Sequence, residues 1–349
     1  MRTAFYMSLL EFLAEWNNAD SCVRVHTSGS TGKPKELLVE KSRMLASARI
    51  TCDFLQLKPG DTALLCMPLD YIAGKMMVVR SIERDLNLIE VRPSNHPLAD
   101  IPLSSSAKGL IMGKIDFAAM VPSQVFGSLE VPEERELLKQ IRHLIIGGGA
   151  VSAEMEQTLS TFPNAIWSTY GMTETLSHIA LRRISDPDAS LWYTPFQGVE
   201  ISIANPESDN PNIGQLVIDA PHVCPETLVT NDIVEIDTSK RFRIIGRKDN
   251  VICSGGIKLH IEEIEEKLRP YIHAPFCISK RTDKKFGEVA VLLLNDNYNY
   301  NDNYYNTICR EVLPAYSVPK AIFFVEEIPL TGTGKIDRAK ARMMVETLS

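Results

Sequence analysis

The first 195 residues or so alternate short apolar runs with longer segments of mixed polarity. A helix is predicted from residue 42 to residue 55, because Leu45, Ala48, Cys52 and Leu55 recur at helical spacing and Ser42 can cap the first turn. The short apolar runs predicted as strands are 62–66, 87–91, 109–112, 141–146 and 165–169. Strands separated by helix-length segments predict a largely parallel sheet with helices on its faces.

Strand candidates follow one another closely between about residue 195 and residue 245. The sequences VEISI, GQLVI, IVEI and RFRII are separated by turn residues, which is typical of a small antiparallel region. A new unit begins near residue 248, where Ile261, Ile264 and Leu268 share one helical stripe opposite glutamates. We therefore expect an α/β protein with a large N-terminal domain over 1–247 and a small mobile α+β domain over 248–349.

The small domain is expected to continue through strands in PFCIS, VAVLLL and AIFFV and through a short helix over 308–313. Between the second of these strands and the helix, residues 295–306 contain only Asn, Asp and Tyr. Such a polar segment predicts a solvated loop with no chemical role.

Charge and composition exclude several classes of function. The 37 Lys and Arg against 44 Asp and Glu give a net charge of −7, and the basic residues are dispersed, so no nucleic-acid partner is expected. Because no apolar run approaches the roughly 20 residues that span a bilayer, we expect no stable membrane insertion and a cytoplasmic location. The seven cysteines show no C-x-x-C pair or zinc spacing, which predicts reduced thiols, mostly buried.

A loop rich in glycine and hydroxyl groups, HTSGSTGKPKE, occupies residues 26–36. Its glycines let successive backbone N–H groups point into one concavity, and its hydroxyls and lysines add donors and positive charge, so it suits phosphate. It is not the common P-loop, since Thr27 stands where that motif needs glycine and Pro34 follows the lysine. A flexible surface loop is the alternative. The candidate phosphate-binding residues are Thr27, Ser28, Gly29, Ser30, Thr31, Gly32, Lys33 and Lys35.

Two further loops follow predicted strands, where α/β proteins bind ligands. After 141–146 come three glycines, 147–149, and Ser152 is placed to cap the next helix, although the dinucleotide fingerprint is not present. After 165–169 comes YGMTET, in which Tyr170 can stack on a flat base and Glu174 can bind a hard cation such as Mg²⁺. Packing in the core is the alternative role for Tyr170.

Weaker signals lie further along the chain. Asp232 can accept hydrogen bonds from ribose hydroxyls, and Arg247 is a candidate donor to a nucleotide. Gly255 and Gly256 can let a narrow ligand pass close to the backbone, and Lys335 stands in the loop PLTGTGK. Taken alone, Asp232 can be an ordinary turn aspartate and Lys335 an ordinary solvated lysine.

In this order along the chain, the motifs resemble those of the acyl-adenylate-forming ligase superfamily, which contains acyl-CoA synthetases, adenylation domains and luciferase relatives. The motifs are TSGSTGKPK, YGMTET, TND, GRKDN with the GG and EIE that follow it, and PLTGTGK, and they extend from about residue 26 to residue 338. Two features depart from the family. Asn231 replaces the glycine of the usual T-G-D element, and only about 25 residues precede Thr27, so a trimmed N-terminal subdomain is expected.

The resemblance implies an AMP-forming acid–CoA ligase that uses ATP, Mg²⁺ and coenzyme A as co-substrate. It implies that the loop at 27–35 holds the β- and γ-phosphates, that Thr173 and Glu174 organise Mg²⁺ and the α-phosphate, and that Lys335 stabilises charge in the adenylation step. It also implies a hinge at Asp249. The other nucleotide-binding positions that it implies are Gly148, Gly149, Tyr170, Gly171, Asp232 and Arg247, and the residues implied for the coenzyme A tunnel are Ser254, Gly255 and Gly256.

Two segments, PLDYIAGKMMVVR at 68–80 and GMTETLSHIAL at 171–181, are similar to the o-succinylbenzoate:CoA ligases of menaquinone synthesis. That group places a basic residue six positions after a glycine, here Arg80. A buried arginine can hold the second carboxylate of an aromatic keto-diacid, and the alternative is a surface arginine paired with Glu83 on the same helix. The candidates for the substrate pocket are Gly74, Lys75, Arg80, Thr175 and His178.

Other functions stay open at this stage. The enzyme can act on a different aryl or fatty acid, or transfer the acyl group to a carrier protein instead of coenzyme A. A different class, a non-catalytic nucleotide-binding relative, is favoured by the trimmed N-terminus and by Asn231, whereas Glu174 and Lys335 argue against it. ATP turnover that depends on an added acid distinguishes these classes. The expected partner is a small aromatic carboxylic acid, and the sequence also allows a homo-oligomer.

Overall fold

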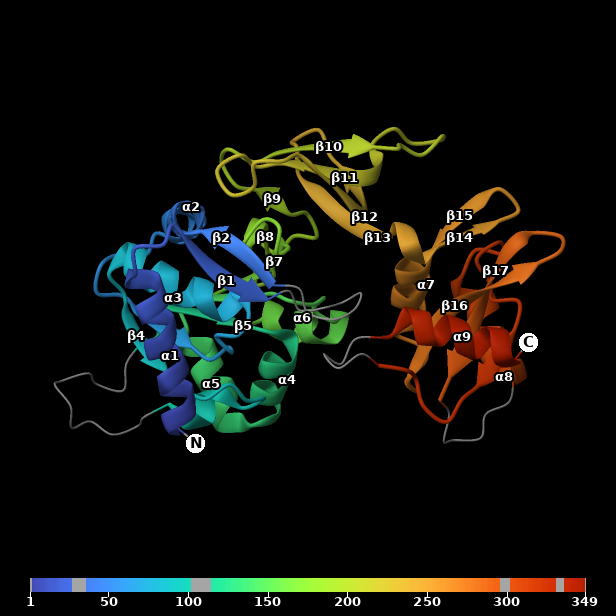
Figure 1. The fold of residues 1–349 in the computed structure, drawn as a ribbon. Helices are drawn as coiled ribbons and strands as arrows, with labels where there is room; N and C mark the ends of the chain where they lie inside the picture. Colours follow the sequence, from blue (N-terminus) through green and yellow to red (C-terminus); the bar gives the residue numbers. More distant parts are fainter. Residues whose placement is uncertain (1, 27–35, 102–113, 296–301, 331–335, 349) are drawn as a thin grey trace. The chain divides into compact units, whose positions relative to one another are not determined.

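The fold is seen in a computed structural model that describes residues 2–26, 36–101, 114–295, 302–330 and 336–348 (Figure 1). The chain divides into two compact units. The first unit contains 1–201, 218–228 and 238–242, and the second contains 202–217, 229–237 and 243–349. The domain limits expected from the sequence, 1–247 and 248–349, stay a prediction.

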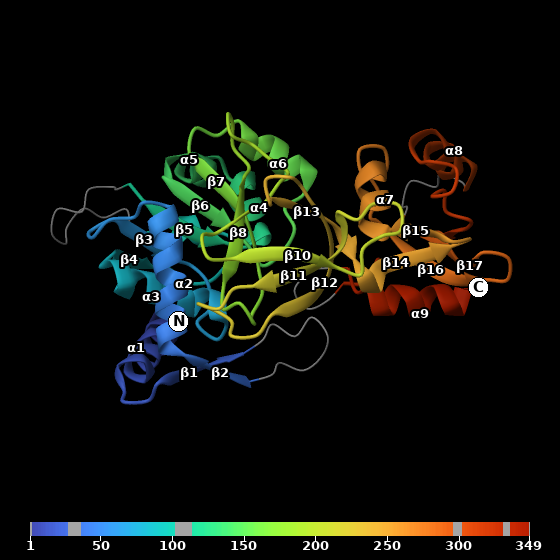
Figure 2. The same ribbon diagram turned by 90° about the horizontal axis from the view of Figure 1, so that it is seen from above.

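The first unit is built on a seven-stranded sheet in the order β4-β3-β5-β6-β7-β8-β9. The strands from β4 to β7 pair in parallel, whereas β8 and β9 are antiparallel. Figures 1 and 2 show α2 and α3 on one side of this sheet and α4 to α6 on the other. The strands are β3 (Thr62–Leu65), β4 (Asn87–Glu90), β5 (Phe117–Met120), β6 (His143–Ile146), β7 (Ala165–Gly171), β8 (His178–Arg183) and β9 (Thr194–Pro195). The helices are α3 (Ile72–Arg84), η1 (Pro97–Asp100), α4 (Pro122–Glu130), α5 (Pro132–Gln140) and α6 (Ala153–Ser160).

The predicted mixed α/β fold is confirmed. Four of the predicted strands are present as β3, β4, β6 and β7, and the expected strand at 109–112 lies outside the described residues. β5, whose four residues are all buried, was not predicted from the sequence. A strand covered on both faces needs a continuous apolar run rather than an alternating one, and FAAM is too short to reveal it.

A helix and a hairpin precede the large sheet. They are α1 (Arg2–Asn17), β1 (Cys22–His26) and β2 (Glu36–Glu40), and β1 and β2 pair in antiparallel. The predicted helix at 42–55 is α2 (Lys41–Phe54). Its predicted capping residue, however, is wrong. Because β2 runs directly into the helix, Glu40 occupies the cap position, and the Ser42 hydroxyl lies inside the first turn, 3.4 Å from the Glu40 carboxylate.

A four-stranded sheet contains β10 (Glu200–Ala204), β11 (Ile213–Asp219), β12 (Leu228–Ile236) and β13 (Phe242–Arg247). The order of its strands follows the chain, as the closely spaced strand candidates predict. The seven cysteines are all free thiols, of which Cys253 is exposed and Cys22 half-buried, so the expectation of mostly buried, reduced cysteines is confirmed. Within the described residues, no helix has the length and apolar character needed to cross a membrane.

The second unit contains a five-stranded sheet in the order β15-β14-β17-β16, with β18 added in parallel to β17. One face packs under α7, where the predicted stripe of Ile261, Ile264 and Leu268 is buried, and the other face packs under α9. The elements are η2 (Lys248–Asn250), β14 (Val251–Ser254), β15 (Ile257–His260), α7 (Ile261–Leu268), β16 (Phe276–Asp283), β17 (Gly287–Leu294), α8 (Asp302–Val312), β18 (Ile322–Phe324) and α9 (Arg338–Leu348).

Of the loop predicted at 295–306, residues 296–301 lie outside the described residues. The last part of the prediction is wrong, because α8 begins at Asp302. Tyr305 is only 3% exposed and packs in the same cluster as Ile308, Cys309 and Val312. The spacing of these residues is helical, so burying them on one face favours a helix over a loop from Asp302 onward. A composition of Asn, Asp and Tyr alone does not reveal this stripe.

Candidate active site

The loops that follow β6 and β7 lie at one edge of the sheet, because these neighbouring strands are parallel. The first contains the three glycines, and Gly148 has φ +77°, a conformation that favours glycine. The predicted cap of the next helix is confirmed, since the Ser152 hydroxyl accepts a hydrogen bond from the Met155 N–H at 3.2 Å. A tight turn thus opens α6 beside the end of β7.

The second loop, from Gly171 to Ser177, is held rigidly by its own backbone. A Cβ atom on Gly171 would lie 2.3 Å from the Ser177 carbonyl oxygen, so only glycine permits this approach. Thr175 is fully buried, and its hydroxyl accepts from the Met172 N–H at 3.1 Å and lies 2.8 Å from the Ser177 carbonyl. The Thr175 side chain therefore fixes the loop from the inside.

Glu174 is exposed at the tip of this loop, and its carboxylate makes no hydrogen bond or ion pair within the part of the chain that the structure describes. The residues that the structure describes contain no cluster of three or more His, Cys, Asp or Glu that could hold a metal ion. Mg²⁺ commonly binds to one or two carboxylates together with substrate phosphates. A single free carboxylate fits a metal that arrives with the nucleotide.

Tyr170 is 7% exposed and lies in an aromatic cluster. Its ring centroid is 5.0 Å from that of Phe242 and 6.0 Å from that of Tyr193, with edge-to-face geometry in both pairs. These contacts agree with the core-packing alternative for Tyr170, and stacking on a base remains a prediction.

Arg80, on α3, is the most unusual group beside this loop. It is 2% exposed, and its Nη2 donates a hydrogen bond of 2.6 Å to the Ser177 hydroxyl. Its Nε is buried without a partner, and no carboxylate pairs with this guanidinium in the described residues. Burial lowers the pKa of Arg80 to about 10, so the side chain still carries its charge at neutral pH.

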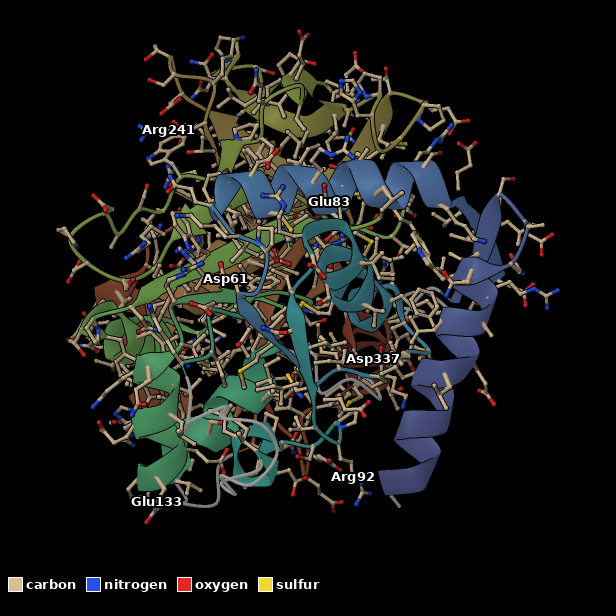
Figure 3. The ribbon with its side chains drawn as sticks, turned by 90° about the vertical axis from the view of Figure 1, so that its left-hand side faces the viewer. Asp61, Glu83, Arg92, Glu133, Arg241 and Asp337 are labelled. Carbon is tan, nitrogen blue, oxygen red and sulfur yellow. The ribbon has the colours of Figure 1, made fainter. Side chains whose placement is uncertain are left out.

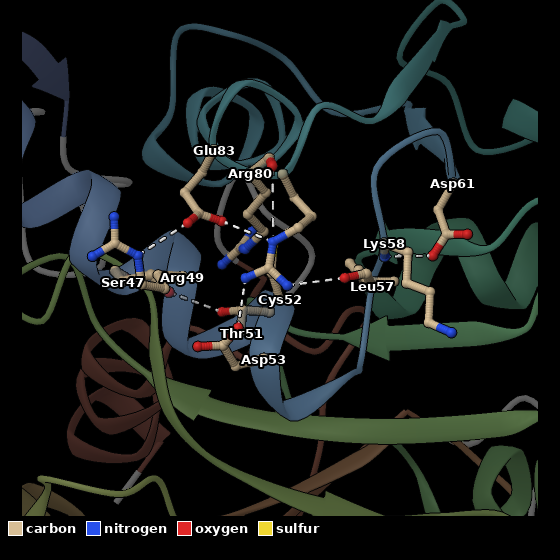
Figure 4. A network of polar contacts seen from close by, with 11 residues as sticks. Ser47, Arg49, Thr51, Cys52, Asp53, Leu57, Lys58, Asp61, Arg80 and Glu83 are labelled. Atoms are coloured by element: carbon tan, nitrogen blue, oxygen red, sulfur yellow. Dashed lines mark hydrogen bonds and ion pairs between the residues drawn. The ribbon is translucent and has the colours of Figure 1, made fainter.

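The alternative of a surface arginine paired with Glu83 is therefore wrong. Glu83 instead pairs with Arg49 at 3.0 Å and with Arg84 at 3.3 Å, in the network of Figure 4. In Figure 3 the labelled Glu83 lies where α2 and α3 meet. Arg80 enters that network through its carbonyl oxygen, to which the Cys52 thiol donates at 3.9 Å, whereas its guanidinium is buried and donates to Ser177.

A chain of hydrogen bonds continues from Ser177 through His178 to α2. The Thr51 hydroxyl donates to the Ser47 carbonyl at 3.2 Å, so at 3.0 Å it accepts from Nε2–H of His178. Nδ1 of the neutral ring then accepts from the Ser177 hydroxyl at 3.2 Å. Burial, and then the charge of Arg80, lower the pKa of His178 well below its ordinary value, so the ring is neutral.

The register of β7 and β8 shifts between Tyr170 and Gly171. Such an irregularity can re-aim a side chain next to a functional site, and here His178 meets Thr51 on the covering helix. His178 was predicted from the sequence, whereas Ser177 and Thr51 were not. The signals for them were weak: a serine directly before His178, and a threonine on a face of α2 that also buries Ser47.

Two further substrate candidates lie nearby on α3. A Cβ atom on Gly74 would lie 2.2 Å from the Pro68 carbonyl oxygen, which accounts for the glycine by close packing. The Lys75 ammonium donates a short hydrogen bond to the Arg24 carbonyl and lies 3.7 Å from the Glu15 carboxylate. Lys75 thus contacts α1 and β1, and a role for it in binding substrate remains a prediction.

The second unit contains its own polar cluster. Arg247 lies 3.0 Å from the Asp232 carboxylate and 3.5 Å from that of Asp249. The amide of Asn231, which stands where the family has glycine, donates to Asp249 at 3.3 Å. The residues implied for ribose binding and for the hinge therefore contact one another directly.

A basic and aromatic surface adjoins the glycine turn between β14 and β15. Gly255 N–H donates to the Phe286 carbonyl at 2.7 Å, which fixes this turn against the β16–β17 hairpin. The ammonium groups of Lys285 and Lys320 lie 5.2 and 5.8 Å from the centre of the exposed Phe286 ring. Lys320 and Lys285 make no ion pair within the described residues, so this surface is positively charged. Gly255 adjoins this surface through its hydrogen bond to Phe286, and Ser254 and Gly256 are the neighbours of Gly255 in the chain.

The phosphate-loop candidates, Thr27 to Lys35, and Lys335 lie outside the described residues. The structure does describe the residues on either side of the loop that contains Lys335. Leu330 and Ile336 pair across an isolated antiparallel bridge, and Arg338 makes a bidentate ion pair with the buried Glu265 at 2.6 and 2.7 Å. This pair anchors the start of α9 within the second unit.

Comparisons with known proteins identify the family of this chain. The profile of the family described as AMP-binding enzyme matches residues 10–226. An acyl-CoA synthetase (AMP-forming)/AMP-acid ligase II-like protein of Dyadobacter fermentans is 31% identical, with a TM-score of 0.65 over 100% of this chain and 96% of that one. The 2-succinylbenzoate–CoA ligase of Listeria monocytogenes is 24% identical over 95% of this chain and 72% of its own length. The o-succinylbenzoate–CoA synthetase of Bacillus subtilis, solved with its acyl-adenylate intermediate, shares the fold at 21% identity and a TM-score of 0.73, over 91% of this chain and 68% of that one.

The chain belongs to the AMP-binding enzyme family. The superfamily expected from the order of the motifs is thereby confirmed, and so is the class of enzyme, AMP-forming acid–CoA ligases, at the level of the family. The Dyadobacter relative has nearly the same extent as this chain.

Proposed function

We propose that this protein is an ATP-dependent acid:CoA ligase whose acid is o-succinylbenzoate, and that it acts in menaquinone synthesis. The observation that carries the proposal is Arg80, a buried cation without a carboxylate partner in the described residues, next to the loop that follows β7. An unpaired buried charge is costly, so an anionic ligand that pairs with it gains a large, specific stabilisation. The relatives named for 2-succinylbenzoate support the same acid.

In the proposed reaction, the acid's reacting carboxylate attacks the α-phosphate of ATP, giving acyl-AMP and pyrophosphate. The thiol of coenzyme A then attacks the acyl carbon and displaces AMP. Arg80 pairs with the second carboxylate, and the chain through Ser177, His178 and Thr51 fixes the orientation of its guanidinium. The protein's contribution is positioning and charge stabilisation.

The roles proposed for the nucleotide-binding residues follow from the family resemblance. Asp232 accepts hydrogen bonds from the ribose hydroxyls, with Arg247 holding its carboxylate in place. The loop at 27–35 holds the β- and γ-phosphates, and Thr173 and Glu174 lie near the α-phosphate. Mg²⁺ bound at Glu174 would supply charge neutralisation at the phosphates. Lys335 stabilises the charge that develops as the carboxylate attacks.

We propose that the nucleotide end of coenzyme A binds the basic surface around Phe286, from which the glycine turn leads to the thiol tunnel. Phe286→Ala is expected to raise the KM for coenzyme A roughly tenfold, because stacking of a base on an aromatic ring contributes about 1–3 kcal/mol. The rate of ATP–pyrophosphate exchange, which needs no thiol, should not change. Tyr316→Ala, which removes another exposed ring of the second unit, is the matched control. An unchanged KM in the Phe286 variant would remove this assignment.

Asp249→Pro is expected to impair one half-reaction far more than the other. Proline fixes φ, and a hinge needs backbone freedom to alternate between two arrangements. The measurement compares ATP–pyrophosphate exchange with thioester formation from supplied acyl-AMP. Asp249→Ala, which removes the same contacts with Asn231 and Arg247 but leaves φ free, is the control. Equal loss in both half-reactions, or no loss, argues against a hinge at this position.

The direct test of the function is acid-dependent ATP–pyrophosphate exchange with o-succinylbenzoate, simple benzoates and fatty acids. Exchange with o-succinylbenzoate alone supports the proposal. Exchange with another acid keeps the mechanism and changes the substrate, and the absence of exchange with any acid supports a non-catalytic nucleotide-binding relative.

A further inference from the structure

A cavity lies at the opposite end of the parallel strands from the glycine loops. It has a volume of about 450 Å³, within the range of small-molecule sites, and it belongs entirely to the first unit. Arg142 and His143, at the start of β6, line it together with Trp167 of β7, and Phe54 and Lys58 close it from the end of α2 and the turn beyond. It contains none of the residues proposed for the ligase reaction.

The floor of the cavity is aromatic. Trp167 pairs with Ile145 in the β6–β7 register, so Trp167 and His143 stand on the same face of the sheet. The Phe54 ring meets the indole edge-to-face at a centroid distance of 5.1 Å. The Arg183 guanidinium, from the partner position on β8, lies 5.0 Å from the indole centre. A flat ligand would find large apolar surfaces here.

Some polar atoms of the lining residues have no partner within the described residues. Three buried atoms here have no hydrogen-bond partner: Nε1 of Trp167, Nε of Arg142 and Nδ1 of His143. The first two are donors only, and each unmade hydrogen bond of a buried group is costly. Burial lowers the pKa of His143 to about 4, so the imidazole is neutral and can donate or accept.

The charge of the lining is positive in a chain of net charge −7. Two cations and no acidic residue line the cavity. Arg142 is balanced by Asp61 at 2.6 Å and Asp116 at 3.3 Å, but Lys58 is exposed and makes no ion pair in the described part of the chain. Only the Lys58 backbone N–H donates to Asp61, and Figure 4 shows the lysine side chain extending away from that carboxylate.

We propose that this cavity is a second binding site, distinct from the ligase site, and that its ligand is a small aromatic carboxylate. The ring lies against Trp167 and Phe54, and the carboxylate pairs with Lys58. This inference does not rest on the proposed substrate, because its residues and those of the reaction are separate.

The test titrates the protein with 4-nitrobenzoate, which quenches tryptophan fluorescence when it binds close to an indole. Saturable quenching is expected from the wild type and from Trp192→Phe, and it should disappear in Trp167→Phe. Lys58→Ala should weaken the apparent affinity about fivefold, as expected for one exposed ion pair, whereas Lys340→Ala, an exposed lysine of α9, should leave it unchanged.

Two control ligands define the chemistry. Neutral 4-nitrobenzamide and inorganic phosphate should each bind at least about fivefold more weakly than 4-nitrobenzoate in a competition titration, since each lacks either the charge or the ring. The proposal is overturned if Lys58→Ala binds as the wild type does, if Trp167→Phe keeps the saturable quenching, or if phosphate competes as well as the nitrobenzoate. These titrations measure binding alone, so their outcomes can be interpreted even if the ligase assay shows no activity.

Discussion

Lys335→Ala is expected to abolish acyl-adenylate formation and to spare thioester formation from supplied acyl-AMP. A single preorganised positive group at the reacting oxygens typically contributes about 10²–10³ in rate, and the adenylation step develops charge at the attacking carboxylate and the phosphate. The second step, in which a thiol displaces AMP, does not require this lysine in the proposed mechanism. The two steps are measured separately, as ATP–pyrophosphate exchange and as thioester formed from synthetic acyl-AMP.

The matched control for this prediction is Lys340→Ala, an exposed lysine on α9 of the same unit. It should leave both steps unchanged. If both steps survive in Lys335→Ala, or if both fall together, the assignment of Lys335 to the adenylation step is wrong.

Arg80→Met is expected to lower kcat/KM for o-succinylbenzoate by at least about 30-fold while affecting simple benzoates little. Removing one partner of a buried, hydrogen-bonded charge pair costs roughly 2–5 kcal/mol, and the proposed ligand supplies the missing partner. Methionine has a similar length, and it removes a buried charge that has no carboxylate partner in the described residues, so the variant should be at least as stable as the wild type.

The control variant is Arg49→Met, which removes an exposed arginine of α2 that pairs with Glu83. It should keep the wild-type preference among acids. A merely structural role for Arg80 predicts a lower melting temperature and equal losses for all acids, and that pattern would contradict the proposed carboxylate contact.

The sequence predicted the parts of the fold that depend on strong periodicity. The apolar runs of β3, β6 and β7 and the stripe of α7 were visible because burial repeats along them. β5 was missed because a four-residue strand buried on both faces has no alternation. The beginning of α8 was missed because a single tyrosine, Tyr305, provides the apolar contact at its first turn.

The candidate site, too, was predicted from the sequence only in part. Ordered motifs identified the family, and spacing from a glycine identified Arg80, but neither could decide whether that arginine was buried. Arg80 and its partner Ser177 are 97 residues apart, and Thr51 and His178 are 127 residues apart. The position of His178 also depends on the register shift between β7 and β8. Such contacts arise from tertiary packing and leave little local signal in the sequence.

The central claim, that a buried arginine reads the second carboxylate of the acid, is tested most directly by one pair of substrates. The measurement is kcat/KM for coenzyme A thioester formation with o-succinylbenzoate and with its analogue esterified only at the succinyl carboxylate, using wild-type protein and Arg80→Met. We expect the wild type to prefer the diacid by at least about 30-fold and Arg80→Met to lose that preference. A preference that is the same in both proteins would contradict the account.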